Sequence, residues 1–191
     1  MLNLLILLLF PYFGCNNLDI MILADYSGSV QGSEKFLYNS ISSFEKGLDI
    51  SEDNVNLGIV VFNSYSEVIC SLESDPREIR DRIELLSTYV AGGTTNLSSA
   101  LYSAFDEFAT KGRDGYKKII IIISDGQPDY GDDTYKVAQQ VKSLGMQIYT
   151  ILIDNNISNT AYMKSIASEG CFYNTDYEGL VKTLEQINLC L

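Results

Sequence analysis

The chain contains no histidine, and this absence excludes several kinds of active site. Catalytic dyads and triads that use imidazole as a base cannot form, and neither can metal sites with imidazole ligands. The four cysteines lie far apart and include no C-x-x-C pair, which disfavours a zinc site made of thiolates. Without a visible pair of nucleophile and base, the sequence favours a binding protein over an enzyme.

Basic residues are also scarce, with 13 Lys and Arg against 25 Asp and Glu and a net charge of -12. Nucleic-acid binding draws much of its affinity from Lys and Arg, so nucleic acid is not an expected partner. An acidic surface suits a bound cation instead. Only three prolines and 46% hydrophobic residues in 191 positions indicate one folded globular domain.

The first ten residues are almost entirely apolar, but a helix needs roughly 18 apolar residues to span a bilayer. Residues 1–14 are therefore expected to be a signal peptide, and the protein to be secreted or extracellular rather than membrane-spanning. The segment lacks the usual basic start and an A-x-A cleavage site. Lipid attachment at Cys15 and a buried N-terminal strand remain as alternatives.

From Leu18 onward, short apolar runs without polar alternation are separated by longer amphipathic stretches. This pattern is typical of parallel strands that helices cover on both faces, and it predicts an α/β fold. The turn at Asn63 and Ser64 is short enough for an antiparallel hairpin, which makes the sheet mixed. Strands are expected at 18–24, 55–62, 67–72, 119–123, 147–153 and 171–173, and helices near 36–48, 76–86, 97–108, 134–144, 159–167 and 177–187.

The segment Asp25-Tyr26-Ser27-Gly28-Ser29 lies where the first strand is expected to end. Its alternate residues offer one carboxylate and two hydroxyls, which are oxygen donors of the kind that Mg²⁺ binds in sets of about six. Aspartate and serine also cap helices by accepting hydrogen bonds from the N–H groups of the first turn. Taken alone, the segment fits either a helix cap or a metal site.

Two further segments share this placement. Gly92-Gly93-Thr94-Thr95 precedes an expected helix, and Ser124-Asp125-Gly126 follows the most apolar strand. Each is ordinary turn sequence when taken by itself. In open α/β sheets, however, ligands bind beyond the carboxyl ends of strands, where the connectivity reverses direction. Convergence of three such loops favours a site in which Asp25 and Asp125 face each other.

In this order, the three segments resemble the von Willebrand factor type A domain family over essentially all of residues 18–189, so residues 15–191 are expected to form that domain. The resemblance implies a doubly wound, mostly parallel central sheet with one antiparallel edge strand and helices on both faces. It also implies a metal-ion-dependent adhesion site that holds Mg²⁺ or Mn²⁺ and accepts an acidic side chain from a protein partner. Carried over by position, the metal ligands are Asp25, Ser27, Ser29, Thr95 and Asp125.

Two positions in this pattern leave a choice open. Thr95 is taken as the ligand because the resemblance places a threonine five residues before the small residue Ala100, and Thr94 is the alternative. Tyr26 stands where serine is commoner in the family. Its side chain is expected either to line the rim of the site or to pack beside the first helix.

The cysteines and the remaining acidic cluster complete the expectations. The resemblance implies a disulfide between Cys15 and Cys190, as in extracellular relatives, and that bond would close a long loop. Cys70 and Cys171 fall on strands expected at opposite edges of the sheet, so they are expected to be unpaired, with their mutual pairing as the alternative.

Three aspartates ahead of one helix fit helix caps better than a second cation site: Asp129, Asp132 and Asp133.

The expected function is a secreted, cation-dependent protein-binding or adhesion module without enzymatic activity. The alternative is a scaffold subunit of a larger assembly in which the metal is structural. A metal-dependent phosphohydrolase with a nucleophilic aspartate is disfavoured, because such enzymes need a second carboxylate two residues later, where this chain has Ser27.

Overall fold

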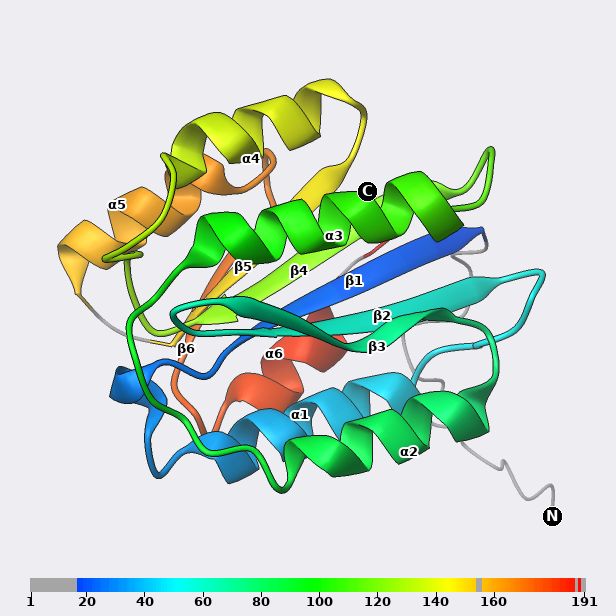
Figure 1. Ribbon diagram of the computed structural model, residues 1–191, viewed down its shortest axis with the longest axis horizontal. Helices are drawn as coiled ribbons and strands as arrows, with labels where there is room; N and C mark the ends of the chain where they lie inside the picture. Colours follow the sequence, from blue (N-terminus) through cyan, green and yellow to red (C-terminus); the bar gives the residue numbers. More distant parts are fainter. Residues whose placement is uncertain (1–16, 154–155, 188, 190–191) are drawn as a thin grey trace, which may run out of the picture.

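A six-stranded sheet lies between two layers of helices in the computed structural model, which describes residues 17–153, 156–187 and 189 (Figure 1). The strands are β1 (Leu18–Asp25), β2 (Val55–Phe62), β3 (Ser66–Glu73), β4 (Lys117–Ser124), β5 (Gln147–Ile153) and β6 (Phe172–Thr175). The helices are α1 (Glu34–Lys46), α2 (Pro76–Leu86), α3 (Leu97–Lys111), α4 (Thr134–Ser143), α5 (Ile157–Ile166) and α6 (Leu180–Gln186), with a 3-10 turn, η1 (Gly28–Val30), after β1.

The strand order is β3-β2-β1-β4-β5-β6, and every neighbouring pair is parallel except β2 and β3. Parallel strands need a long crossover, whereas the few residues between Phe62 and Ser66 can only join antiparallel neighbours. The doubly wound sheet with one antiparallel edge strand is therefore confirmed. Because β1 leads to β2 on one side while β4 lies on its other side, the connectivity reverses between β1 and β4.

Each face of the sheet carries its own apolar core. Alternate residues of β1 point to opposite faces: Ile20 and Ile22 pack with α1, α2 and α6, while Met21 and Leu23 pack with α3, α4 and α5. Figure 1 shows these two helix layers below and above the sheet. The five isoleucines of Ile119–Ile123 are fully buried, as expected for a central strand covered on both sides.

Most element boundaries agree with the sequence expectations to within two residues. The helix α2 begins as predicted, with Pro76 at its first position and the Asp75 carboxylate accepting a hydrogen bond from Arg77 N. The main difference is α6, which begins at Leu180 rather than near Tyr177. Its start is delayed because Asp176 Oδ1 accepts a hydrogen bond from Gly179 N at 2.7 Å and holds the preceding residues in a turn.

Some expectations fall on residues outside the described ranges: the signal peptide at 1–14, its boundary with 15–191, and the Cys15–Cys190 disulfide. Cys70 in β3 and Cys171 just before β6 are buried free thiols at opposite edges of the sheet, which confirms that they are not paired with each other. No helix within the described parts of the chain has both the length and the apolar character needed to cross a membrane.

Candidate metal centre

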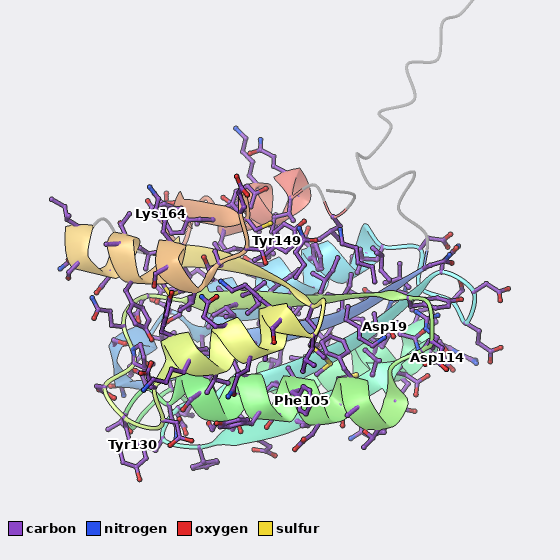
Figure 2. The ribbon with its side chains drawn as sticks, turned by 90° about the horizontal axis from the view of Figure 1, so that it is seen from above. Asp19, Phe105, Asp114, Tyr130, Tyr149 and Lys164 are labelled. Carbon is purple, nitrogen blue, oxygen red and sulfur yellow. The ribbon has the colours of Figure 1, made fainter. Side chains whose placement is uncertain are left out.

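The predicted site lies at the carboxyl edge of the sheet, where the connectivity reverses. Asp25 is the last residue of β1, and Asp125 directly follows the last residue of β4. The two strands are parallel neighbours, so their ends bring both aspartates to the same edge. Figure 2 shows Tyr130, from the loop after β4, at this end of the molecule and Asp19 and Asp114 at the opposite end.

Hydrogen bonds connect four of the five predicted ligands. The Asp25 Oδ1 atom accepts a bond from Ser27 N at 2.8 Å, and the Ser27 and Ser29 hydroxyl oxygens are 3.1 Å apart. The Ser29 hydroxyl in turn donates to Asp125 Oδ1 at 2.9 Å. The structure thus places one carboxylate from each strand end around two serine hydroxyls.

These residues do not act as caps of the first helix. The helix α1 begins only at Glu34, after the cap residue Ser33, and no side chain caps it. Ser27 precedes η1 with an extended backbone, and its hydroxyl likewise makes no capping hydrogen bond. The helix-cap interpretation of Asp25, Ser27 and Ser29 is therefore wrong, because η1 and a turn separate them from α1.

Thr95, the fifth predicted ligand, lies on a loop that is bonded to its neighbours. Its side chain is buried, its backbone N–H donates to Asp129 Oδ1 at 2.7 Å, and its carbonyl accepts from Asp129 N at 3.1 Å. Thr94 is exposed instead, and its hydroxyl donates to Ser64 Oγ at 2.9 Å. Of the two threonines, Thr95 has the better sheltered side chain.

Two glycines allow this loop to lie directly against η1. Gly28 N donates to Gly93 O at 3.0 Å, and Gly92 N donates to Tyr26 O at 2.9 Å. Gly93 has φ of +81°, and a Cβ atom there would lie 2.6 Å from Ser64 Oγ. A larger residue at Gly93 would therefore be strained and would displace either the threonine loop or Ser64 in the β2–β3 turn.

Asp25 is a fully buried carboxylate that forms no ion pair with Lys or Arg among the described residues. Burial raises its pKa, the hydrogen bonds from Ser124 and Ser27 oppose that rise, and the nearby charge of Asp125 adds to it. Ser124 Oγ makes the shortest of these bonds, 2.6 Å to Asp25 Oδ2. A bound cation would offset the cost of burying this charge.

The donor set fits a hard divalent cation. Carboxylate and hydroxyl oxygens are ligands that Mg²⁺ and Mn²⁺ accept readily, whereas zinc prefers nitrogen and sulfur. Asp25, Asp125 and the hydroxyls of Ser27, Ser29 and Thr95 would hold the ion. The described residues contain no group of three or more His, Cys, Asp or Glu arranged for a metal, and the candidate centre itself combines two carboxylates with hydroxyls.

The acidic cluster has structural roles instead. Asp133 caps α4 by accepting a hydrogen bond from Lys136 N, as expected for a carboxylate ahead of a helix. Asp132 accepts a bond from the Tyr102 hydroxyl, and Asp129 holds the Thr95 loop. The contribution of Asp129 was not predicted, because nothing in a run of loop residues indicates which backbone N–H a carboxylate will reach.

Tyr26 does not line the rim of the site. Its side chain is 1% exposed and packs in the core cluster that includes Leu37 of α1. The rings of Tyr26 and Tyr89 meet edge to face, with 6.0 Å between their centroids. The alternative interpretation, that Tyr26 packs beside the first helix, describes its position.

Fold and site together define a doubly wound α/β domain. A cluster of carboxylates and hydroxyls lies at its switch point, the place between β1 and β4 where the connectivity reverses. The chain belongs to the von Willebrand factor type A domain family, which matches residues 19–187. Among curated proteins, it is 29% identical to the collagen alpha-4(VI) chain of Mus musculus over 79% of this chain. It is 27% identical to the thrombospondin-related anonymous protein of Plasmodium berghei over 76% of this chain.

Solved structures show the same fold. The manganese-loaded TRAP protein of Plasmodium vivax superposes with a TM-score of 0.74 at 22% identity, over 88% of this chain and 72% of that chain. Proximal thread matrix protein 1 from the mussel byssus, in a form with a zinc-occupied MIDAS motif, superposes with a TM-score of 0.78 at 19% identity. The match covers 90% of this chain and 47% of that chain. The chain spans only 7% of the collagen relative and 25% of the Plasmodium berghei relative.

Proposed function

We propose that this domain is an extracellular, non-enzymatic protein-binding module that holds Mg²⁺ or Mn²⁺ at Asp25, Ser27, Ser29, Thr95 and Asp125. The observation that carries the proposal is the Asp25 carboxylate, which is fully buried at the switch point and has no ion-pair partner among the described residues. Two similar structures, one manganese-loaded and one with a zinc-occupied MIDAS motif, support a divalent ion in this fold.

The bound ion would supply positive charge and an open coordination position at the surface of an acidic protein. With a net charge of -12, the chain by itself repels acidic groups. Asp25 and Asp125 together carry two negative charges, which a divalent cation neutralises. A partner carboxylate can then approach the edge of the sheet, and the serine and threonine hydroxyls provide neutral donors around it.

Calorimetry with MgCl₂ and MnCl₂ tests the metal centre directly. The variants Asp25→Asn and Asp125→Asn keep the side-chain shape and remove one charge each, so both should lose most of the measurable cation affinity. Asp114→Asn is the matched control, because Asp114 is exposed at the opposite end of the molecule. Cation affinity equal to wild type in both site variants would contradict the assignment.

The binding role needs a separate experiment. Protein immobilised in MgCl₂ should retain partners from an extracellular fluid that are released by EDTA, and the Asp25→Asn variant should retain none of them. Partners that stay bound in EDTA would instead favour the scaffold function, in which the metal only supports the fold.

A further inference from the structure

A small cavity lies beside the candidate metal centre. It has a volume of about 90 Å³ and is lined by residues that include Tyr26, Phe62, Tyr65, Glu67 and Tyr89. Phe62 is the register partner of Asp25 on the neighbouring strand β2, and Tyr26 follows Asp25 directly. Since neighbouring strands lie about 4.8 Å apart, the cavity is roughly one to two strand spacings from the metal ligands.

The lining of this cavity is aromatic and acidic. Three tyrosines and one phenylalanine contribute rings, whose faces carry negative partial charge, and Glu67 is the only charged lining residue. Burial, together with the neighbouring Glu67 carboxylate, raises the pKa of Tyr89 to about 12. Glu67 itself is exposed, so its carboxylate is accessible from solvent.

One lining residue, Tyr26, is almost completely buried. Tyr26 is only 1% exposed, and its hydroxyl is buried without a hydrogen bond from any described residue. Because this hydroxyl is closed to solvent, it is not assigned as a contact for a group that enters the cavity. At the entrance, Tyr65 is 65% exposed and can cover an inserted group with its ring.

We propose that this cavity is a subsite that binds a lysine or arginine side chain of the protein partner. A cation close to Glu67 and over aromatic faces matches the one carboxylate and the four rings of a lining that also contains Val61, Asn63 and Val90. The volume of about 90 Å³ leaves room for the end of one such side chain. The subsite deepens the proposed function, because it selects among partners that already present an acidic residue to the metal.

The distance between the two sites limits the partner sequence. An extended chain advances about 3.3–3.6 Å per residue, so the basic residue should lie within roughly one to three residues of the acidic one. Together, an acid at the metal and a base in the cavity would distinguish such a partner from a simple acidic surface.

The subsite is tested first without metal, so that its failure is separate from failure of the metal centre. In EDTA, N-acetyl-lysine methylamide should shift the NMR resonances of the Tyr65 and Tyr89 rings, and the neutral analogue N-acetyl-norleucine methylamide should not. Glu67→Gln should weaken lysine-amide binding by about fivefold or more. Glu169→Gln, a change at an exposed glutamate before the opposite edge strand, is the control and should leave binding unchanged.

The coupling to the metal centre is tested next, with peptides that carry one aspartate and one lysine at separations of one to four residues. In MgCl₂, the best separation should bind more tightly than peptides in which either residue is replaced by alanine. Asp25→Asn should remove the aspartate contribution and leave lysine-amide binding intact. Equal shifts with the lysine and norleucine amides, or lysine-amide binding unaffected by Glu67→Gln, would overturn the subsite.

Discussion

Asp19 and Asp25 lie at opposite ends of β1 on the same face of the strand, and both carboxylates are fully buried. Asp19 is neutralised by Arg113, whose guanidinium lies 2.6 Å from Asp19 Oδ1. Asp25 has hydrogen-bond donors but no ion-pair partner among the described residues. The strand β1 therefore carries a carboxylate paired with arginine near its start, at Asp19. Its other buried carboxylate, Asp25, has no arginine or lysine partner among the described residues and lies at the end proposed to bind metal.

The first prediction concerns the buried ion pair between Asp19 and Arg113. Arg113→Ala should lower the free energy of unfolding by about 3–5 kcal/mol, because it leaves Asp19 buried without its partner. The loss also includes the bonds from Arg113 to the carbonyls of Leu18 and Glu52 and its stacking on Tyr116. Urea unfolding followed by circular dichroism measures the change.

Two controls accompany this variant. Arg82→Ala removes an exposed ion pair with Glu78 on α2, and it should change stability far less. The folded fraction of Arg113→Ala should keep wild-type cation affinity, because Arg113 contacts Asp19, at the other end of β1 from Asp25. A large loss of cation affinity at matched folded fraction would show that the two ends of β1 are coupled.

A second prediction concerns Ser124, whose hydroxyl donates the 2.6 Å bond to Asp25 Oδ2. Ser124→Ala should weaken cation binding roughly tenfold, because outer hydrogen bonds orient metal-ligating carboxylates. Ser124→Thr retains the hydroxyl and should recover most of the affinity. Calorimetry with MnCl₂ measures the cation affinity of both variants. Wild-type affinity in Ser124→Ala would show that Ser124 does not position the Asp25 carboxylate for the metal.

The third prediction separates the two adjacent threonines. Thr95→Val should reduce cation affinity, since the side chain keeps its shape but loses the proposed ligand oxygen. Thr94→Val should leave affinity nearly unchanged, because the Thr94 hydroxyl is bonded to Ser64 in the β2–β3 turn. The reverse ranking in cation titrations would make Thr94 the ligand.

Much of the fold, and the convergence of the segments that carry Asp25 and Asp125, could be predicted because the relevant signals are local. The apolar run of β4 and the short turn at Asn63 and Ser64 determine a buried central strand and an antiparallel edge. The segments around Asp25 and Asp125 were recognisable because strand ends in a parallel sheet share one edge.

The features that were not predicted depend on contacts between distant segments. The role of Ser124 toward Asp25 arises because β1 and β4 are adjacent, and the pairing of Asp19 with Arg113 joins β1 to the loop before β4. Tyr26 continues the alternation of β1 into the cluster that contains Ile20 and Ile22, but its burial also depends on Tyr89, which lies far away in the sequence. Sequence periodicity carries no information about such distant contacts.

The last prediction concerns the ends of the domain. Asn17 O accepts a hydrogen bond from Lys117 N at 2.9 Å, and Leu189 O accepts one from Lys117 Nζ at 3.3 Å, so the first and last described residues both reach the start of β4. Cys15 and Cys190 lie close to these residues in sequence, and we propose that they form a disulfide, which contributes about 4–5 kcal/mol in the chain-entropy model.

In exported protein, mass spectrometry of a non-reduced digest should show a Cys15–Cys190 peptide, and reduction should lower the melting temperature. Cys70 should resist alkylation in the native protein at pH 8, because burial raises its pKa to about 12 and leaves very little thiolate. Unfolding should expose Cys70 and Cys171 to the reagent together, since both thiols are buried. Rapid alkylation of Cys15 in the folded, non-reduced protein, or a dominant Cys70–Cys171 peptide, would be incompatible with this pairing.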